Sequence, residues 1–532
     1  MLPRRPSSFH GRLLAALSLL TLGPALVNSS PSHLPSCANL QIPTSSSNGF
    51  RIISTKTAEV FNYTSVAGFD FCNISVTLTH PGANDVVYTE LWLPLTKQIW
   101  NGHFVATGGG GLVAGFESSL PPFVQQGYAS AYTDAGITIN NTIDPSTGAW
   151  AISSPGHLNH ALIENFAYRS IHDMTVLSKA AIRAFYGCAP VYSYYSGCST
   201  GGRMGYFAAQ HYPNDFDGIL ANSPAINTPQ VSPADFWPSV VMANIVAPPQ
   251  CIFDTYLEAI TTFCDGVDGV VDGLVSEPAL CHFNTSSLVG QTVNCSSPAS
   301  QIQITAQHAE VIAKTLQGAT SITGEFLWYG LAPGAPFTGL ANTAYTNGSV
   351  VPVPFSAAQY WIGYFVDQVP NANTATLTFD EFDTAFARSV ELFTGILGTD
   401  DPDLTAFKHK GGKLLTFHGL ADPLITHWGT TRYYERLQRN MGGAAAVNEF
   451  YRLFLAPGVG HCGGGTGPNP ADAWGALTDW VEHGIVPLTL FANTTTVTRD
   501  LCPYPSKLQY NGKGDINLAS SFACVPSDGS GY

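Results

Sequence analysis

A serine between two glycines is the first feature of this chain that could do chemistry. Residues 197–201 read Gly-Cys-Ser-Thr-Gly, which fits the G-x-S-x-G pattern of a nucleophile elbow. In an elbow, a sharp strand-to-helix turn lifts the serine hydroxyl clear of the sheet. The flanks agree, because residues 191–195 are β-branched and aromatic and residues 203–210 are typical of a helix. Glycine and serine are also common in ordinary turns, so a plain turn is the alternative.

The serine of this pattern, Ser199, needs a base, because a serine hydroxyl is a weak nucleophile at neutral pH. In α/β-hydrolases the chain order is Ser, then Asp or Glu, then His. Asp422 follows an expected strand at 412–419, and His461 follows another at 449–455. Both therefore lie beyond strand ends, where open α/β sheets place their chemistry. We predict a catalytic triad; the alternative is an aspartate that caps a turn and a histidine on the surface.

Two cysteines stand directly beside the predicted triad. Cys198 precedes the serine and Cys462 follows the histidine. A disulfide between them would close a loop of roughly 260 residues, which in the chain-entropy model stabilises by about 5 kcal/mol before strain is counted. The bridge would also fix the distance between nucleophile and base, which matters more for catalysis.

Four consecutive glycines, residues 108–111, follow an expected strand at 103–107. They lack the Gly-Lys-Ser/Thr ending of a phosphate loop, which excludes nucleotide binding there. Glycines in this place suit an oxyanion loop, because backbone N–H groups must approach the substrate oxygen unobstructed. We expect the N–H groups of Thr200 and Gly110 to stabilise the oxyanion. A flexible surface turn is the alternative for the glycine run.

The chain begins like an exported protein. Residues 1–28 combine a basic start, a short apolar stretch at 13–22 and a plausible cleavage zone, which is the pattern of a signal peptide. The apolar stretch is too short to span a membrane, and no second one follows. Eleven cysteines agree with an oxidising compartment. We therefore expect a secreted, extracellular protein.

The composition limits the partners. Only 11% of the residues are charged and the formal net charge is −15. Nucleic-acid binding needs a basic surface, so we expect neither nucleic acid nor an anionic membrane as a partner. Sequons for N-glycosylation, which would add polar surface, occur at Asn62, Asn73, Asn140, Asn284, Asn294, Asn347 and Asn493.

The spacing of the expected strands indicates an insertion. About 190 residues separate the strand expected at 218–225 from the next at 413–417, whereas a β-α-β unit takes about 30. We therefore expect an inserted lid domain at 227–400, between core segments at 29–226 and 401–532. Aromatic pairs in the insertion would suit an aromatic substrate, although each could instead belong to the insertion's own core.

Within this insertion, residues 264–274 place Asp265, Asp268 and Asp272 among glycines. Ca²⁺ takes six to eight oxygen ligands from carboxylates and carbonyls, so the segment is typical of a calcium loop, although not of an EF-hand. The ion would be structural, because the loop is far in sequence from the triad and lacks the histidines of a catalytic zinc site. An acidic turn with solvated carboxylates is the alternative.

Several of these segments resemble the fungal tannase/feruloyl esterase family. The similar stretches are Gly197 to Arg203, the loop around Asp422, Gly460 to Cys462, and parts of 127–134, 168–175 and 501–505. The resemblance implies an α/β-hydrolase fold with a large inserted lid domain. It also implies the Cys198–Cys462 disulfide and a calcium site in which the carbonyls of Val270 and Leu274 join the three aspartates.

The resemblance implies a reaction as well. Ser199 would attack an ester carbonyl, His461 would carry the proton to the leaving alcohol, and Asp422 would orient His461, with no organic cofactor. The family hydrolyses hydroxycinnamoyl esters of plant cell-wall sugars or galloyl esters of tannins. We expect a feruloyl esterase acting on small aromatic esters or feruloylated polysaccharide. A tannase, or a secreted wall-binding protein of hydrolase fold with no turnover, is the alternative.

The other cysteines suggest further bridges, although connectivity does not follow from sequence. The expected pairs are Cys37–Cys72, Cys251–Cys295, Cys264–Cys281 and Cys502–Cys524. Cys188 is left over, and we expect it to be a buried free thiol.

Overall fold

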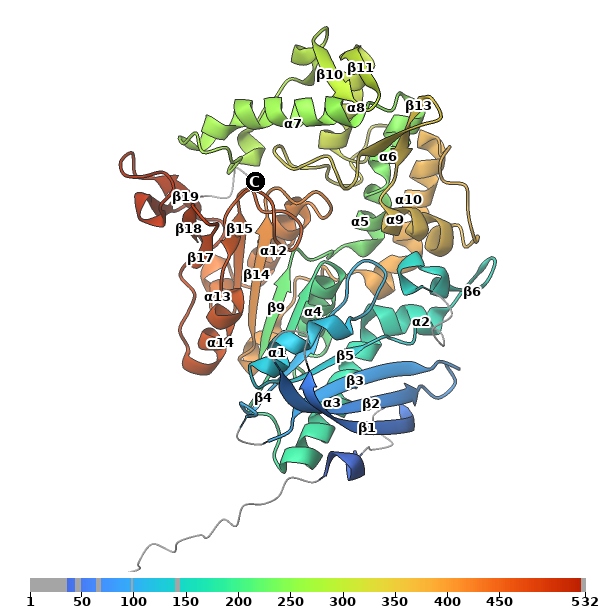
Figure 1. Cartoon of the computed structure of the whole chain (residues 1–532), viewed down its shortest axis with the longest axis vertical. Coiled ribbons are helices and arrows are strands. Elements are labelled where there is room, and N and C mark those ends of the chain that lie inside the picture. The colour runs from blue at the N-terminus through green and yellow to red at the C-terminus, as the bar shows by residue number, and fades with distance from the viewer. Residues whose placement is uncertain (1–35, 44–48, 64–67, 97–98, 139–143, 528–532) are drawn as a thin grey trace, which may run out of the picture. The chain divides into compact units, whose positions relative to one another are not determined.

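A nine-stranded mixed sheet organises this computed structural model (Figure 1). Its strand order is β1-β2-β3-β5-β4-β8-β9-β14-β15. The strands from β1 to β5 pair antiparallel, and those from β5 to β15 pair parallel. The bounds are β1 Arg51–Tyr63, β2 Phe69–Thr79, β3 Val87–Pro94, β4 His103–Thr107, β5 Ala129–Thr133, β8 Tyr192–Cys198, β9 Gly218–Asn222, β14 Lys413–Gly419 and β15 Tyr451–Ala456.

The structure describes residues 36–43, 49–63, 68–96, 99–138 and 144–527. The expected signal peptide at 1–28 and the sequon at Asn140 lie outside the described residues. Among the described residues, no helix is both long and apolar enough to cross a membrane.

The parallel half of the sheet forms as the sequence predicts. Strands β4, β8, β9, β14 and β15 are short runs of apolar and aromatic residues, most of them buried. Strands of this kind are apolar along their whole length because helices pack on both faces of a parallel sheet and bury them. Helices that contact them include α3 Ser170–Tyr186, α4 Thr200–His211, α12 His427–Asn440 and α14 Ala473–His483. This arrangement is the α/β-hydrolase fold that the sequence predicts.

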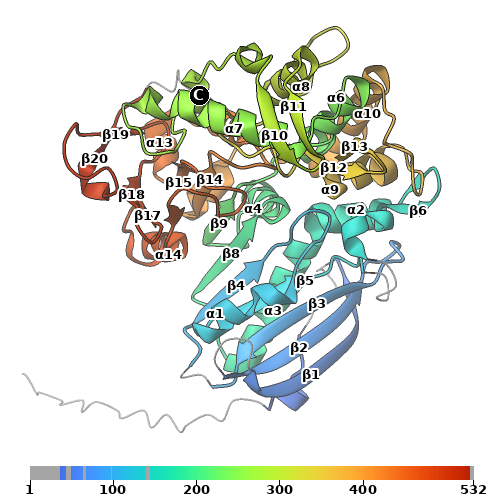
Figure 2. The same cartoon turned by 45° about the horizontal axis from the view of Figure 1, so that its top comes forward.

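Between β9 and β14 the chain leaves the central sheet for residues 223–412. Both views show helices of this insertion gathered away from β1 and β2, in the upper part of the picture (Figures 1 and 2). Its helices are α5 Thr228–Ala234, α6 Trp237–Asn244, α7 Gln250–Cys264, α8 Ala306–Gln317, α9 Ser356–Tyr360, α10 Phe379–Leu397 and α11 Thr405–Lys410. Its hairpins are β10 Thr292–Ser296 with β11 Ala299–Gln303, and β12 Asn342–Thr346 with β13 Ser349–Val353.

The insertion has a hydrophobic core of its own. Trp237, Phe253 and Phe382 are buried together in one cluster. Trp361 is fully buried as well and stacks on Phe365, with ring centroids 4.3 Å apart. These aromatic side chains stabilise the insertion, so they are not available to a substrate.

The remaining α-helices and strands of the described residues are short. Before the elbow these are α1 Pro121–Gln125, β6 Ile152–Ser154, β7 His157–Leu158 and α2 His160–Glu164. After β14 they are α13 Ala444–Asn448, β16 Asn469–Pro470, β17 Leu490–Asn493, β18 Thr498–Leu501, β19 Lys507–Tyr510 and β20 Phe522–Val525.

Five disulfides join the same five pairs of cysteines that the sequence analysis proposes. They are Cys37–Cys72, Cys198–Cys462, Cys251–Cys295, Cys264–Cys281 and Cys502–Cys524. The expectation for Cys188 is half wrong, because the thiol is free but exposed. It follows Gly187, whose left-handed conformation (φ 79°) ends α3 and turns the chain onto the surface.

Candidate active site

Ser199 occupies the turn between β8 and α4. Its backbone is left-handed, with φ 61° and ψ −125°, a conformation that costs a non-glycine residue about 1–3 kcal/mol. Hydrogen bonds hold it there: the Ser199 N–H donates to the Asn222 carbonyl at 3.0 Å, and the Ala225 N–H donates to the Ser199 carbonyl at 3.1 Å. A Cβ on Gly197 would lie 2.6 Å from the Gly201 backbone. The glycines of the motif therefore let strand and helix meet closely.

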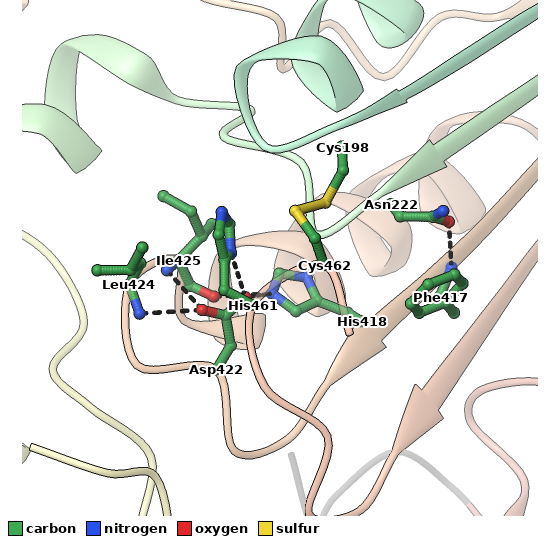
Figure 3. The surroundings of a disulfide bond; sticks show 9 residues. All are labelled: Cys198, Asn222, Phe417, His418, Asp422, Leu424, Ile425, His461 and Cys462. Carbon is green, nitrogen blue, oxygen red and sulfur yellow. Dashed lines mark hydrogen bonds and ion pairs between the residues drawn. A yellow bond between two sulfur atoms is a disulfide. The ribbon is translucent and has the colours of Figure 1, made fainter. Parts of the chain in front are cut away.

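Asp422 and His461 form a hydrogen-bonded pair. His461 Nδ1 lies 2.8 Å from Asp422 Oδ2 (Figure 3). The other oxygen, Oδ1, accepts the N–H groups of Leu424 and Ile425, each at 2.9 Å. Burial opposes ionisation of Asp422, but the hydrogen bonds from His418 and His461 outweigh it and hold the pKa of this carboxyl well below its ordinary range. The carboxylate can therefore orient His461 at any physiological pH.

The Cys198–Cys462 disulfide joins the two halves of the site. It links the residue before Ser199 to the residue after His461, with the Cα atoms 5.9 Å apart (Figure 3). Ser199 and His461 line the same cavity, of about 640 Å³. No hydrogen bond between their side chains occurs in the described structure, and in ligand-free enzymes this contact is often long until substrate binds.

His418, whose sequence context predicts only a place in a strand, is a second partner of Asp422. It is fully buried at the end of β14, and its Nε2 lies 2.7 Å from the Ile425 carbonyl and 3.3 Å from Asp422 Oδ2. Because a carbonyl only accepts, Nε2 carries the proton. Its Nδ1 lies 3.0 Å from Thr430 Oγ1. The signal available in sequence was a histidine four residues before the predicted acid.

The glycine run lies against the elbow but does not supply the expected donor. The Gly110 N–H donates to the Val113 carbonyl at 3.1 Å, so it is already engaged. The expectation for Gly110 is therefore wrong, because a local bridge between these two residues uses the amide. In the described structure the Gly109 and Gly111 amides have no such acceptor. The role of Thr200 stays a prediction: as the first residue of α4, it has no intrahelical acceptor for its N–H, which is therefore available to an oxyanion.

The alternative of a flexible surface turn for the glycine run does not fit its packing. Gly108 and Gly109 are buried. A Cβ on Gly108 would lie 2.1 Å from Tyr195 Oη, and one on Gly109 would lie 2.0 Å from the Val113 carbonyl oxygen. The Gly201 N–H donates to the Gly109 carbonyl at 3.1 Å, which ties the run to α4.

The cavity beside Ser199 is largely apolar. Side chains from both the core and the insertion line it, among them Leu112, Phe116, Phe166, Val231, Leu424 and Ile425. Its volume falls within the range of pockets that bury a small organic ligand. Apolar and aromatic walls of this kind suit an aromatic ring.

The acidic segment of the insertion is arranged around its own backbone. Asp265 Oδ1 accepts the Asp272 N–H at 2.9 Å, and Asp268 Oδ1 accepts the Val270 N–H at 3.0 Å. Asp272 Oδ2 pairs with Arg499 Nη2 at 2.6 Å. Within the part of the chain that is described, no three His, Cys, Asp or Glu side chains are grouped closely enough to hold a metal ion. The donor types, carboxylates and carbonyls, are nevertheless those that Ca²⁺ prefers.

A strained serine at an elbow, a histidine paired to a buried carboxylate and a parallel sheet define a serine hydrolase of the α/β-hydrolase fold. Comparison with known proteins gives the family. The model of the family described as "Tannase and feruloyl esterase" matches residues 72–525. The chain belongs to this family of carboxylic ester hydrolases.

Relatives and solved structures agree with this membership. The chain is 44% identical to a probable feruloyl esterase of Arthroderma benhamiae over 473 residues, covering 87% of each chain. It is 32% identical to a probable feruloyl esterase B-2 of Aspergillus terreus, covering 86% of each. Among solved structures, a tannin acyl hydrolase from Aspergillus niger matches with TM-score 0.84 and 28% identity, covering 92% of this chain and 94% of that one. Feruloyl esterase B from Aspergillus oryzae matches with TM-score 0.75 and 25% identity, covering 90% and 97%.

Proposed function

We propose that this chain is a secreted serine esterase that hydrolyses hydroxycinnamoyl esters of plant cell-wall sugars, that is, a feruloyl esterase. The observation that carries the proposal is the His461–Asp422 pair, tied by the Cys198–Cys462 disulfide to the loop of Ser199. The apolar cavity beside Ser199 supports an aromatic acyl group. The 44% identical relative, itself named a probable feruloyl esterase, supports the same acyl class.

In the proposed reaction, Ser199 Oγ attacks the ester carbonyl carbon while His461 Nε2 takes its proton. The carbonyl oxygen becomes an oxyanion, which the N–H of Thr200 and that of Gly109 or Gly111 stabilise. The carbon–oxygen bond to the alcohol then breaks, and His461 gives the proton to the leaving alcohol. Water then attacks the acyl carbon while His461 Nε2 takes its proton, the bond from this carbon to Ser199 Oγ breaks, and His461 returns the proton to Ser199 as the acid leaves.

A tannase is the second candidate, because the tannin acyl hydrolase from Aspergillus niger superimposes with a TM-score of 0.84. A panel of methyl ferulate, methyl gallate and a p-nitrophenyl ester separates the candidates. A feruloyl esterase has the higher kcat/KM on methyl ferulate, whereas a tannase has it on methyl gallate. A non-catalytic wall-binding protein would hydrolyse none of the three and would leave a serine-directed phosphonate unreacted.

We further propose that residues 227–400 act as the lid of the site and that their acidic segment holds one structural Ca²⁺. The lid role is supported by the cavity, which the insertion lines through residues 228–235 and 355–358. The calcium ligands would be the carboxylates of Asp265, Asp268 and Asp272, which the ion would have to draw closer together than they lie in the structure, with the carbonyls of Val270 and Leu274. The Asp272 carboxylate would then serve both the ion and Arg499.

A further inference from the structure

The short helix α5 turns one face toward the cavity that contains Ser199. Thr228, Val231, Ser232 and Asp235 all line this cavity. Their spacing is i, i+3, i+4 and i+7, which places them on one face of a helix. Asp235 is the last of them and caps the C-terminal end of α5. Asp235 also borders a second, much smaller cavity beside Trp237 and Thr426. The insertion therefore brings an acidic residue to the wall of the space in which the substrate reacts.

Asp235 is unusual among the residues of this cavity. Of the described residues that line it, only Asp235 and His461 carry an acidic or basic side chain. Asp235 is only 7% exposed. Its carboxyl oxygens take part in no hydrogen bond among the described residues, and they are not among the fully enclosed polar atoms that lack a partner, so a ligand or water can reach them. A buried carboxyl without a protein partner is a costly feature unless a ligand or water pairs with it.

The surroundings of Asp235 favour the neutral acid. Burial, together with the negative charge of Asp422, raises the pKa of Asp235 well above its ordinary value. The carbonyl groups at the end of α5 also disfavour a negative charge there. A protonated carboxyl group has one O–H donor and retains acceptor capacity. Its complement is a group that both donates and accepts, such as a hydroxyl.

The neighbours of Asp235 suit an aromatic ring. Val231, one turn earlier on α5, packs with Ala225 and Ile425 in a small apolar cluster, and Leu424 and Trp328 pack against that cluster. A ring that lies against such side chains could place a hydroxyl substituent against the carboxyl group. A phenolic hydroxyl can both donate and accept a hydrogen bond, and the acyl ring that carries it can pack against these apolar side chains.

We propose that Asp235 is a specificity-determining residue that hydrogen-bonds a ring hydroxyl of the acyl group and so selects hydroxylated aromatic esters. This rests on the proposed esterase function. It concerns the acyl ring alone, so the alcohol half of the ester is kept constant in the test. The role is one of binding, since Asp235 takes no part in bond making or breaking.

The test compares three methyl esters on the purified full chain. Methyl caffeate has free ring hydroxyls, methyl 3,4-dimethoxycinnamate has both of them capped, and methyl cinnamate has none. The variants are Asp235→Leu, which removes the polar group, and Asp235→Asn, which keeps a donor and an acceptor. Ser232→Ala is the matched control, because it removes a neighbouring polar group on the same face of α5.

We expect wild-type kcat/KM for methyl caffeate to exceed that for the other two esters by about ten- to a hundredfold. Asp235→Leu should lose this preference while its kcat/KM for methyl cinnamate stays within about threefold of wild type. Asp235→Asn and Ser232→Ala should keep most of the preference. If Asp235→Leu does not fold, calorimetric binding of caffeic and cinnamic acids to wild type and Asp235→Asn replaces it. Wild type should then bind caffeic acid the more tightly, and Asp235→Asn should keep most of that difference.

Four results would overturn the proposal, three of which concern Asp235→Leu and the binding assay. An Asp235→Leu variant that keeps the caffeate preference would do so, as would one that loses activity equally on all three esters. In the binding assay, equal affinity of wild type for the two acids would do the same. Failure of the proposed function would be distinguishable: a wild-type protein that hydrolyses none of the three esters contradicts the esterase itself, whereas one that hydrolyses all three at similar rates contradicts only the role of Asp235.

Discussion

At the scale of single residues, the site is built around one buried carboxylate. Asp422 Oδ2 faces His461 at 2.8 Å and His418 at 3.3 Å, and Oδ1 accepts two backbone N–H groups. Each contact restricts the rotation of the carboxylate, and the carboxylate in turn restricts the ring of His461. His418 therefore acts through Asp422 and is a positioning residue.

The role of His418 is open to test with His418→Phe, which keeps a ring but removes the donor. We expect kcat on methyl ferulate to fall about tenfold or more with little change in KM, because a loosely held triad loses orientation in the transition state. His409→Phe is the control, since His409 is exposed on α11. A parallel rise in KM, or a fall in kcat no larger than that of the control, would contradict a positioning role.

Some residues of the site could be predicted from the sequence and others could not. Ser199, Asp422 and His461 follow from motif, chain order and strand ends, because the elbow needs its glycines wherever it occurs. The prediction of the Gly110 N–H as an oxyanion donor was wrong, because a local bridge to Val113, which the sequence does not reveal, already engages this amide. His418 had only a weak signal, its place four residues before Asp422, because its burial and hydrogen bonds depend on the folded loop. Asp235 could not be singled out, since its place at the cavity depends on segments distant in sequence.

At the scale of elements, two loops must be held together. The elbow follows β8 and the histidine loop follows β15, and these strands are separated in the sheet by β9 and β14. The strand order alone does not hold Ser199 and His461 close to each other. The Cys198–Cys462 disulfide supplies the direct link between the two loops.

Removing this disulfide should affect activity more than stability. We expect the Cys198→Ala/Cys462→Ala double variant to fold with a modest decrease in Tm but to lose about a hundredfold in kcat, because a displacement near 1 Å can cost that much. The matched control is Cys502→Ala/Cys524→Ala, which removes a bridge between residues that do not line the cavity. Equal activity in the two double variants would contradict the account.

The acidic segment that follows α7 is the second element-scale feature. If it binds Ca²⁺, a strong chelator should lower Tm, because a ligand bound only to the folded state stabilises it. Asp268→Asn should lower Tm in the presence of calcium and make it insensitive to chelator. Elemental analysis gives an independent measure, with about one calcium expected per chain. A Tm unchanged by chelator, together with no calcium in the protein, would reject the site.

At the scale of the whole molecule, a buried ionic cluster joins the antiparallel and helical parts of the core. His80 follows β2, and its ring nitrogens lie 2.6 Å from Asp85 and 2.8 Å from Asp173 of α3. Burial opposes its charge, but the hydrogen bonds to Asp173 and Asp85 outweigh burial and raise the pKa of His80 to about 9. Because the folded-state pKa exceeds the ordinary 6.5, this contribution to stability is fully present below pH 6.5 and is lost as pH rises through 9.

Urea unfolding as a function of pH measures this contribution. His80→Gln should be less stable than wild type at pH 6, and the difference in unfolding free energy should shrink between pH 6.5 and 9. His483→Gln, on an exposed histidine of α14, should show no such pH-dependent difference. A difference between wild type and His80→Gln that stays constant across this range would show that the charge of His80 does not stabilise the fold.

As with the single residues of the site, part of the overall architecture could be predicted from the sequence and part could not. The parallel strands and the position of the insertion follow from apolar runs and their spacing in the sequence. The pairing of β4 with both β5 and β8, and the entry of α5 into the cavity, depend on contacts between distant segments, which local patterns do not contain.

The central claim is that Ser199 is the nucleophile, and covalent labelling tests it most directly. A fluorophosphonate should modify the wild-type protein once, at Ser199, and abolish hydrolysis of methyl ferulate in proportion to labelling. Ser199→Ala should remain folded and unlabelled, with kcat lower by roughly 10⁴-fold or more. Labelling at another residue, or more than about a tenth of wild-type activity in Ser199→Ala, would contradict the account.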